Sequence, residues 1–299
     1  MSDMDAHNME MVGMETNTEP RSGVLYIVAT PIGNLEDMTF RAVRILGEVA
    51  VIAAEDTRHS RKLLTHFGIS TPLTSCFAHN EMQKREQLVE RLLKGDDIAL
   101  ISDAGTPAIC DPGSMLVQLC VEKGVRVVPV PGASAVIAGL SAAGLPTDMF
   151  TFVGFVPAKK SERVAFLQRW GTLEHTLVAY EAPHRLLASL EDISTHLGEK
   201  RELVVARELT KVHEELFRGE AAQAHAYFST QRVKGEIVLL LRAQPKPEVR
   251  ESVEETLLRL LKAGDQSLRQ VSKEVALIHP ISGSEAYSRA LELQREPKD

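Results

Sequence analysis

The sequence predicts an α/β protein made of two α/β domains with mostly parallel sheets, followed by a small helical unit at the C-terminus. From Gly23 onward, short β-branched runs alternate with amphipathic stretches, which is the pattern of repeated strand–helix units. The strand-like runs are almost continuously apolar, as in parallel sheets that helices cover on both faces. After Pro247 the pattern is helical only.

The N-terminal α/β domain is expected over residues 23–144. Its helix Glu81–Lys94 is typical of the amphipathic helices expected here, because Leu88 and Leu92 repeat at helical spacing on one face. A second helix is expected from a cap at Ser60 through Phe67. The other elements are strands Val24–Ala29, Val49–Ala53, Leu73–Phe77, Asp97–Ile101 and Val125–Val130, and helices Arg41–Leu46, Ser114–Lys123 and Ala133–Ala143.

A second α/β domain is expected over residues 145–243, after the break at Gly144–Thr147. Two prolines within Ala243–Pro247 favour an extended linker. A helical unit of helix-turn-helix proportions should then occupy residues 250–296. The expected elements are strands Phe150–Phe155, Leu177–Tyr180, Leu203–Ala206, Glu214–Arg218 and Ile237–Leu241, and helices Glu162–Trp170, Arg185–His196, Val253–Ala263, Ser267–Ile278 and Ser284–Leu293.

The composition is that of an ordinary globular protein: 299 residues, 44% hydrophobic and 25% charged. Residues 1–22 carry five acids against one base and have no apolar core, so a disordered lead-in is expected there and not a signal peptide. The uncharged stretch Val127–Leu145 approaches the length of a membrane span. Pro129 and Pro131 interrupt it, so we expect a strand, a turn and a helix instead.

The cysteines indicate the cellular compartment of the protein, and the net charge limits how it could bind RNA. Cys76, Cys110 and Cys120 form no C-x-x-C pair, which argues against disulfides or zinc and for a cytoplasmic protein. The formal net charge of −7 lacks the basic surplus of proteins that coat nucleic acid. An RNA partner would therefore be held by a local basic patch or as part of a larger assembly.

Three Gly/Pro-rich turns each follow a predicted strand: Ala29–Asn34, Ser102–Pro107 and Pro129–Ala135. Ligands of doubly wound sheets bind beyond the carboxyl ends of the strands, where small residues allow close approach. Any one of these turns could be only a tight connection between a strand and a helix. Three such turns, each at the end of a strand, favour a binding site. No P-loop and no G-x-G-x-x-G is present, and Asp103 would repel phosphate. A nucleoside-like ligand without phosphates fits best.

Seven blocks of the sequence together resemble one family. They are VATPIGNLEDMTFRA, AAEDTRHS, LISDAGTPAICDPG, VPVPGASA, YEAPHR, ARELTK and KGEIVLLL. In order and spacing they resemble the tetrapyrrole methylase superfamily, and within it the ribosomal branch, the bacterial small-subunit (16S) rRNA 2′-O-ribose cytidine methyltransferases. The resemblance runs from Gly23 to about Leu241, and SDAGTP-x-x-x-DPG is its most specific block.

The resemblance implies S-adenosyl-L-methionine bound in a cleft between the two α/β domains, and a homodimer. Strand-end packing is the alternative role for Tyr180 and Gly235. The residues that the resemblance assigns to the cofactor are Pro31, Ser102, Asp103, Ala104, Thr106, Pro107, Ser134, Ala135, Tyr180, Glu181, Leu209, Thr210, Gly235 and Glu236.

Methyl transfer from a sulfonium requires alignment and no metal ion. A ribose 2′-hydroxyl does need a proton acceptor nearby. Asp56 and Glu208 are the favoured catalytic candidates, although Asp56 could equally cap a helix. Other polar strand ends that could serve are the rest of the Glu55–His59 block, His79-Asn80 and His184-Arg185.

Basic residues in both domains could supply a path for small-subunit rRNA or an assembled subunit, or could simply be solvated. In the ribosomal branch the last helices carry several basic residues, whereas residues 244–299 have nine bases and ten acids. That unit could equally support packing or a dimer. A precorrin-type methyltransferase and a non-catalytic S-adenosylmethionine-binding module remain alternative functions. The expected RNA contacts are Arg58, Arg61, Lys62, Lys159, Lys160, Arg163 and Arg185.

Overall fold

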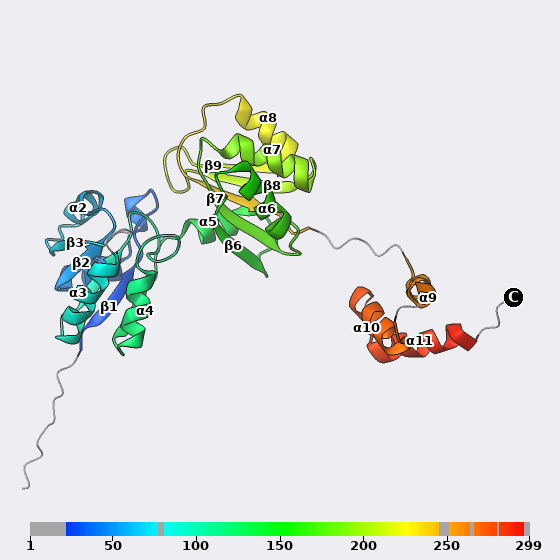
Figure 1. Cartoon of the computed structure of the whole chain (residues 1–299). Helices are drawn as coiled ribbons and strands as arrows, with labels where there is room; N and C mark the ends of the chain where they lie inside the picture. The colour runs from blue at the N-terminus through cyan, green and yellow to red at the C-terminus, as the bar shows by residue number, and fades with distance from the viewer. Residues whose placement is uncertain (1–21, 77–80, 245–250, 264–265, 280, 296–299) are drawn as a thin grey trace, which may run out of the picture. The chain divides into compact units, whose positions relative to one another are not determined.

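The structure is a computed structural model that describes residues 22–76, 81–244, 251–263, 266–279 and 281–295. It divides into two compact units, a larger unit within residues 1–243 and a C-terminal unit within residues 244–299 (Figure 1). The larger unit contains two five-stranded sheets.

The first sheet is entirely parallel, with strand order β3-β2-β4-β1-β5. Its central strand β4 is buried along its whole length. Leu25 of β1 and Val51 of β2 both pair with Ile98 of β4, one from each side. The strands are β1 Val24–Val28, β2 Val51–Ala54, β3 Leu73–Ser75, β4 Ile98–Ile101 and β5 Arg126–Val130.

Helices cover both faces of this sheet, which is why its strands are apolar on both sides. On one face α3 and α4 pack with Leu92 and Leu116 against Leu100. On the other face α1 and α2 pack with Leu46 and Leu64 against Ile52 and its neighbours. The helices are η1 Leu35–Asp37, α1 Phe40–Glu48, α2 Thr57–His66, α3 Glu81–Leu93 and α4 Ser114–Glu122.

The second sheet has strand order β6-β7-β10-β8-β9 and mixed direction. Only β6 and β7 pair in parallel among its described strands, while β7–β10, β10–β8 and β8–β9 are antiparallel. Over both sheets, five of the eight pairings are parallel. The strands are β6 Phe150–Phe155, β7 Thr176–Glu181, β8 Glu202–Arg207, β9 Glu215–Glu220 and β10 Ile237–Leu241.

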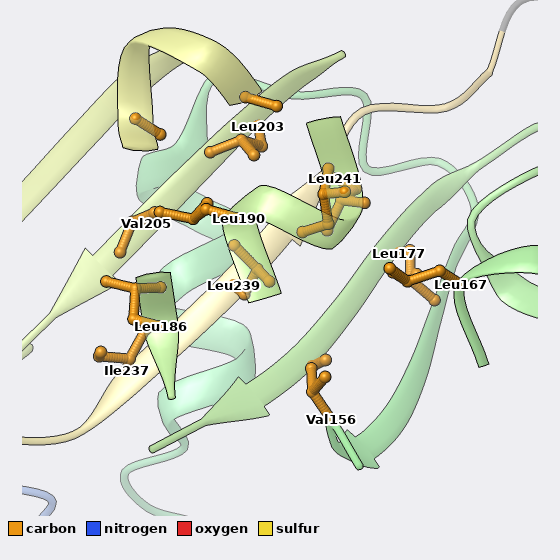
Figure 2. Packing of buried hydrophobic residues seen from close by; sticks show 14 of the residues in the cluster. Val156, Leu167, Leu177, Leu186, Leu190, Leu203, Val205, Ile237, Leu239 and Leu241 are labelled. Carbon is orange, nitrogen blue, oxygen red and sulfur yellow. The ribbon is translucent and has the colours of Figure 1, made fainter. Parts of the chain in front are cut away.

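Alternate residues of the second sheet enter two cores. Leu186 and Leu190 of α7 pack over Leu203, Val205 and Leu239 on one face (Figure 2). The other face carries α5, whose Val136 and Leu140 pack against residues such as Val178. The helices are α5 Ala135–Ala143, α6 Lys160–Trp170, α7 Leu186–Leu197 and α8 Ala221–Ser229.

The C-terminal unit consists of α9 Val253–Ala263, α10 Leu268–Ile278 and α11 Gly283–Arg295. Leu257, Val271, Val275, Ala286 and Ala290 form its buried core. No helix in the described part of the chain has the length and apolar character needed to cross a membrane.

The predicted fold class is confirmed, with three differences of detail. The antiparallel pairings of the second sheet were not predicted, nor was α8. Ser60 does not cap α2: the helix begins earlier, with Asp56 accepting a hydrogen bond from Arg58 N, and Ser60 lies buried inside it. A carboxylate directly before the first turn is the better cap because it also meets the positive end of the helix dipole.

Candidate active site

A cavity of about 500 Å³ lies in the larger unit, lined by residues that follow strands of both sheets. We call it the first cavity. The loop after β4, the start of α5 and the ends of β7 and β8 all contribute to it, together with the start of β10. The expected cofactor residues that line it are Asp103, Ala104, Thr106, Ser134, Ala135, Tyr180, Glu181, Leu209, Gly235 and Glu236.

Four expected cofactor residues do not line the first cavity: Pro31, Ser102, Pro107 and Thr210. Ser102 is buried beneath the loop, where its Oγ donates to Ala104 O at 3.3 Å and its carbonyl accepts from Thr30 Oγ1 at 3.2 Å. Thr210 instead donates its backbone N–H to Glu214 Oε2 at 2.6 Å. The two hydrogen bonds of Ser102 therefore stabilise the conformation of the loop after β4, and its side chain does not face the cavity.

The loop between β4 and α4 has an unusual backbone. Ala108 and Cys110 have φ values of +66° and +64°, a left-handed conformation that side chains disfavour. Thr30 and Gly105 exchange backbone hydrogen bonds of 2.9 and 3.0 Å, which tie this loop to the turn after β1. The loop is thus held in place by the neighbouring turn.

Glu81 anchors the far end of the same loop, and sequence reasoning missed it. Its buried carboxylate accepts hydrogen bonds from the backbone N–H groups of Gly113, Met115 and Leu116 at the start of α4. A glutamate that begins one helix gives no local signal that it caps another. Only the absence of a good N-cap residue before Ser114, where Gly113 stands, could have suggested such a partner.

The charged residues that line the first cavity are all acidic. Among the described residues that line it there are five carboxylates and no Lys, Arg or His; the five are Glu55, Asp103, Asp111, Glu181 and Glu236. Burial raises the pKa of Glu55, and the nearby Asp111 and Asp103 raise it further. Burial also raises the pKa of Asp111, to which Asp103 adds. The cavity therefore favours a cationic ligand over an anion.

Tyr180 gives the first cavity an aromatic wall. Its ring lies 5.0 Å from that of Phe152 and 5.3 Å from that of Phe155, centre to centre. Burial is the main cause that raises the pKa of its hydroxyl to about 12. The neighbouring Glu181 is fixed by Ala182 N at 2.7 Å, by the Ser189 hydroxyl and by Arg185. A flat, apolar ligand group could stack at this wall.

The two favoured catalytic candidates, Asp56 and Glu208, do not line the first cavity. The Asp56 carboxylate caps α2, and its hydrogen bond from Arg58 N lowers its pKa. Its own backbone N–H donates to Asp103 Oδ1 at 3.1 Å. The catalytic role of Asp56 and Glu208 stays a prediction, because neither side chain lines the cavity.

Glu208 holds a turn together. Its Oε1 accepts from Lys211 Nζ at 2.8 Å and from Glu236 N at 3.0 Å. Burial alone would raise the pKa of Glu208, but these hydrogen bonds lower it overall. Through this turn Glu208 fixes Gly235 and Glu236, which line the first cavity.

The expected RNA contacts lie in different environments. Arg58, Arg61 and Lys62 are exposed on α2, and Lys159 and Lys160 are exposed at the start of α6. Arg185 is half-buried and paired with Glu181. Among the other polar strand ends, His184 is exposed, while His79 and Asn80 lie outside the described residues.

Arg163 is the exception, because the structure buries it instead of exposing it to a partner. It is 4% exposed, and its Nε donates to Asp192 Oδ2 at 2.7 Å. Its guanidinium also donates to the carbonyls of Pro157 and Ala158. The helical pattern around residue 163 could not distinguish an inward arginine from a solvated one, since both leave the same charge in the sequence.

Metal ligation finds no support in the part of the chain that the structure describes, where no group of three or more His, Cys, Asp or Glu could hold an ion. The three cysteines are free. Cys110 lines the first cavity, whereas Cys76 and Cys120 are buried in the core of the first sheet.

Comparison with known proteins gives consistent results. Residues 24–225 match the family described as Tetrapyrrole (Corrin/Porphyrin) Methylases. The chain is 49% identical to "Ribosomal RNA small subunit methyltransferase I" of Synechocystis sp. over 278 residues, which covers 92% of this chain and 99% of the relative. The protein of the same name from Pseudomonas aeruginosa is 46% identical, with 91% and 98% covered.

Solved structures share the fold at low sequence identity. A crystal structure of diphthine synthase has a TM-score of 0.59 at 14% identity, covering 74% of this chain and 90% of that one. Uroporphyrin-III C-methyltransferase from Thermus thermophilus, complexed with S-adenosyl homocysteine, has a TM-score of 0.51 at 18% identity, covering 74% and 97%. At such identities the likeness shows the fold alone.

Proposed function

The chain belongs to the tetrapyrrole (corrin/porphyrin) methylase family, and on that premise we propose that it methylates small-subunit ribosomal RNA. The donor is S-adenosyl-L-methionine, and the acceptor is the ribose 2′-hydroxyl of a cytidine in the decoding region of 16S rRNA. The reaction takes place in the cytoplasm, where small subunits are assembled.

The acid-lined first cavity is the observation that carries this proposal. S-adenosyl-L-methionine bears a sulfonium and an ammonium group, which suit a lining with five carboxylates and, among its described residues, no Lys, Arg or His. Glu181 and Glu236 already pair with Arg185 and Lys211 outside the lining, so Glu55, Asp103 and Asp111 supply most of the charge that attracts the cation. The ligand carries no phosphate, in keeping with Asp103 in the lining. A volume of about 500 Å³ lies within the range of about 300–1,000 Å³ typical of small-molecule sites.

The start of α5 suits the carboxylate of the donor. Ser134 is the N-cap residue of α5 but makes no side-chain capping hydrogen bond. The first backbone N–H groups of the helix are therefore available to an anion, which the helix dipole also favours. Ser134 and Ala135 both line the first cavity, so this anion site opens into it. The Tyr180 wall is the proposed surface for the adenine ring.

When bound, the donor supplies a methyl group already activated by the adjacent sulfonium. The chain then has to align the acceptor oxygen and remove its proton. Asp56 and Glu208 were the sequence-based candidates, but we propose Glu55 as the proton acceptor. Glu55 lines the first cavity and makes no ion pair with any described residue, and its raised pKa suits proton exchange closer to neutrality.

The RNA surface is proposed to comprise the exposed basic residues at the two helix starts, together with Arg185 beside the first cavity. It includes all the expected contacts except the buried Arg163: Arg58, Arg61, Lys62, Lys159, Lys160 and Arg185. The target cytidine must be unstacked or lie in an exposed segment, because a ribose within a helix is poorly accessible.

A homodimer is also proposed. Helix α5, the edge strand β6 and the residue before β6 expose apolar side chains that a second copy could cover, namely Ile137, Phe150 and Met149. Sedimentation of the full chain tests this: a monomer at micromolar concentration would contradict it.

The proposed activity is tested by incubating the full chain with methyl-tritiated S-adenosyl-L-methionine and small subunits from a strain that lacks the activity. Label should appear in 16S RNA and remain in an alkali-resistant dinucleotide, which is the signature of a methylated ribose. The Asp103→Ala variant should bind the donor more weakly by about 1–3 kcal/mol, since a half-buried hydrogen-bond acceptor in the lining is lost.

Each alternative function has its own outcome in the same assays. Label on the base contradicts the 2′-position. Turnover of a precorrin but not of RNA would favour a precorrin-type methyltransferase. Tight donor binding with no transfer to any substrate would favour the non-catalytic binding module.

A further inference from the structure

We propose that a second cavity beside the first receives the acceptor nucleotide of single-stranded RNA, with Lys62 and His59 holding a phosphodiester next to the target ribose. The inference rests on the proposed function and extends it, because it assigns a site to the RNA chain itself.

The second cavity has a volume of about 330 Å³ and lies against the first. The two cavities share four lining residues: Ile32, Asp103, Ala104 and Glu236. Molecules held in the two cavities would therefore lie next to each other, beside the four residues that the two linings share. We call these four residues the common wall. Direct methyl transfer requires this adjacency, because acceptor oxygen, methyl carbon and sulfur must lie in line within one site.

The two linings differ in charge. The first cavity has no basic residue among its described lining, whereas the second is lined by Lys62, Lys211 and His59 as well as by the two shared acids, Asp103 and Glu236. Lys62 and His59 make no ion pair with any described residue, and both are exposed on α2. A phosphate is therefore favoured beside α2 in the second cavity and disfavoured beside the five carboxylates of the first, where only the start of α5 suits an anion. A nucleotide phosphate and a cationic donor would separate accordingly.

Lys211 is a fixed cation of the second cavity. Its ammonium is held by Glu208 at 2.8 Å and by Glu236 at 3.1 Å. Its aliphatic chain packs so closely on the turn after β1 that a Cβ placed on Gly33 would lie 2.3 Å from Lys211 Cγ. Because both carboxylates neutralise Lys211, the free charge available to a phosphate comes from α2.

Apart from Asp103, the remaining lining is apolar and suits the base and sugar of a nucleotide. Pro31, Leu35 and Leu63 contribute to it, with Ile32 and Ala104 at the common wall. Pro31, expected to contact the cofactor, lines this second cavity and not the first. A polymer is a better occupant than a free nucleotide, because Arg58 and Arg61 continue the basic surface of α2 beyond the lining.

The transfer step at the common wall is balanced. The 2′-oxygen forms a bond to the methyl carbon while the bond from that carbon to sulfur breaks, and the bonding pair stays on sulfur. The hydroxyl proton passes to a carboxylate, and the products are a 2′-O-methylated ribose and S-adenosyl-L-homocysteine. No further reactant is needed.

The test compares Lys62→Gln and His59→Gln with the matched control Lys200→Gln. Lys200 is exposed and lines neither cavity. Three quantities are measured on the full chain: affinity for a short single-stranded RNA at several salt concentrations, KM for small subunits, and affinity for S-adenosyl-L-methionine by calorimetry. Thermal melting checks that each variant is folded.

We expect Lys62→Gln to weaken RNA binding about tenfold and to raise KM, with kcat and donor affinity nearly unchanged. The slope of log affinity against log salt should fall by about 0.7, the value for one phosphate contact on a single strand. His59→Gln should act in the same direction. An equal loss of donor affinity would overturn the proposal, because it would make both cavities part of the donor site.

Failure of this inference can be told apart from failure of the proposed function. If the wild-type chain methylates RNA but both α2 variants behave like Lys200→Gln, the second cavity is not the acceptor subsite. If the chain binds RNA through Lys62 but transfers no methyl group, the proposed function fails instead. Competition by cytidine 5′-monophosphate as strong as that by the oligonucleotide would overturn the assignment to an RNA chain.

Discussion

Glu81 and Met115 lie 34 residues apart, and the Met115 backbone N–H donates a hydrogen bond of 3.0 Å to the Glu81 carboxylate. The same oxygen accepts from Gly113 N at 3.1 Å and from Leu116 N at 3.3 Å. One buried anion thus satisfies three N–H groups at the start of α4, where the helix dipole also stabilises it. Because α4 follows the loop over the first cavity, this contact fixes one end of the loop.

Replacing Glu81 by Ala should therefore destabilise the larger unit and weaken donor binding. Leaving buried N–H groups without an acceptor costs about 1–3 kcal/mol. Urea unfolding measures the first effect and calorimetry the second. Glu90→Ala is the matched control, since Glu90 is exposed and pairs with Lys94 in a surface contact. Equal stability of the two variants would contradict this role of Glu81.

Replacing Glu55 by Gln, or Asp111 by Asn, should stabilise the ligand-free protein and yet weaken donor binding. Burial raises the pKa of both carboxyls, so folding favours their neutral forms. The stability that they contribute is therefore lost as the pH rises through their folded-state pKa values, and a neutral amide avoids this loss. We expect Tm to rise by about 1–3 °C. A fall in Tm with unchanged donor affinity would contradict the prediction.

Donor binding should also weaken on acidification, starting at a higher pH than for ordinary carboxyls. Protonation of Glu55 or Asp111 removes the negative charge that attracts the cation. Calorimetry between about pH 7 and about pH 5 follows the effect, because unperturbed carboxyls titrate near pH 4. The double variant Glu55→Gln with Asp111→Asn should show a smaller change over this range. An identical pH profile for wild type and double variant would exclude these groups as its cause.

Asp192→Asn tests the inward orientation of Arg163. The two side chains are 3% and 5% exposed and their charged atoms lie 2.7 Å apart. Removing one partner leaves a buried charge without compensation, at a cost of about 3–5 kcal/mol. RNA affinity of the folded variant should stay unchanged. Lys159 lies nearby but is exposed, so the Lys159→Gln variant should show the reverse result: a small change in stability and weaker RNA binding.

Gly235→Ala should disturb the turn that Glu208 holds. A Cβ on Gly235 would lie 2.2 Å from Glu208 Cδ, and Gly235 has a φ of +87° that alanine disfavours. The substitution should displace Glu208 from Glu236 N and weaken donor binding. Gly47→Ala is the control, because Gly47 lies in α1 with open space around it and should gain up to about 1 kcal/mol of stability. Equal donor affinity in both variants would remove this turn from the site.

Local sequence patterns determined most of the elements. The strand Ile237–Leu241 and the helix Val253–Ala263 were predicted with the bounds that the structure has. Helix α8 was missed because its Ala-rich sequence has no strong apolar face, and its capping box depends on Glu220 and Gln223. The turn after β4 was recognisable from the sequence because Gly frees the backbone and Pro restricts it, and both effects are local.

Taken alone, the sequence determined the class of the fold, the strand-end turns and the resemblance to a methylase family, since each depends on residues close together along the chain. Only the tertiary structure decided that β10 runs antiparallel to β7 and β8, that Glu81 caps α4, that Arg163 points inward and that Glu55 joins Asp103 and Asp111 in one lining. Strand direction, burial and the proximity of charges are set by contacts between distant segments. Side-chain spacing along the chain does not encode those contacts.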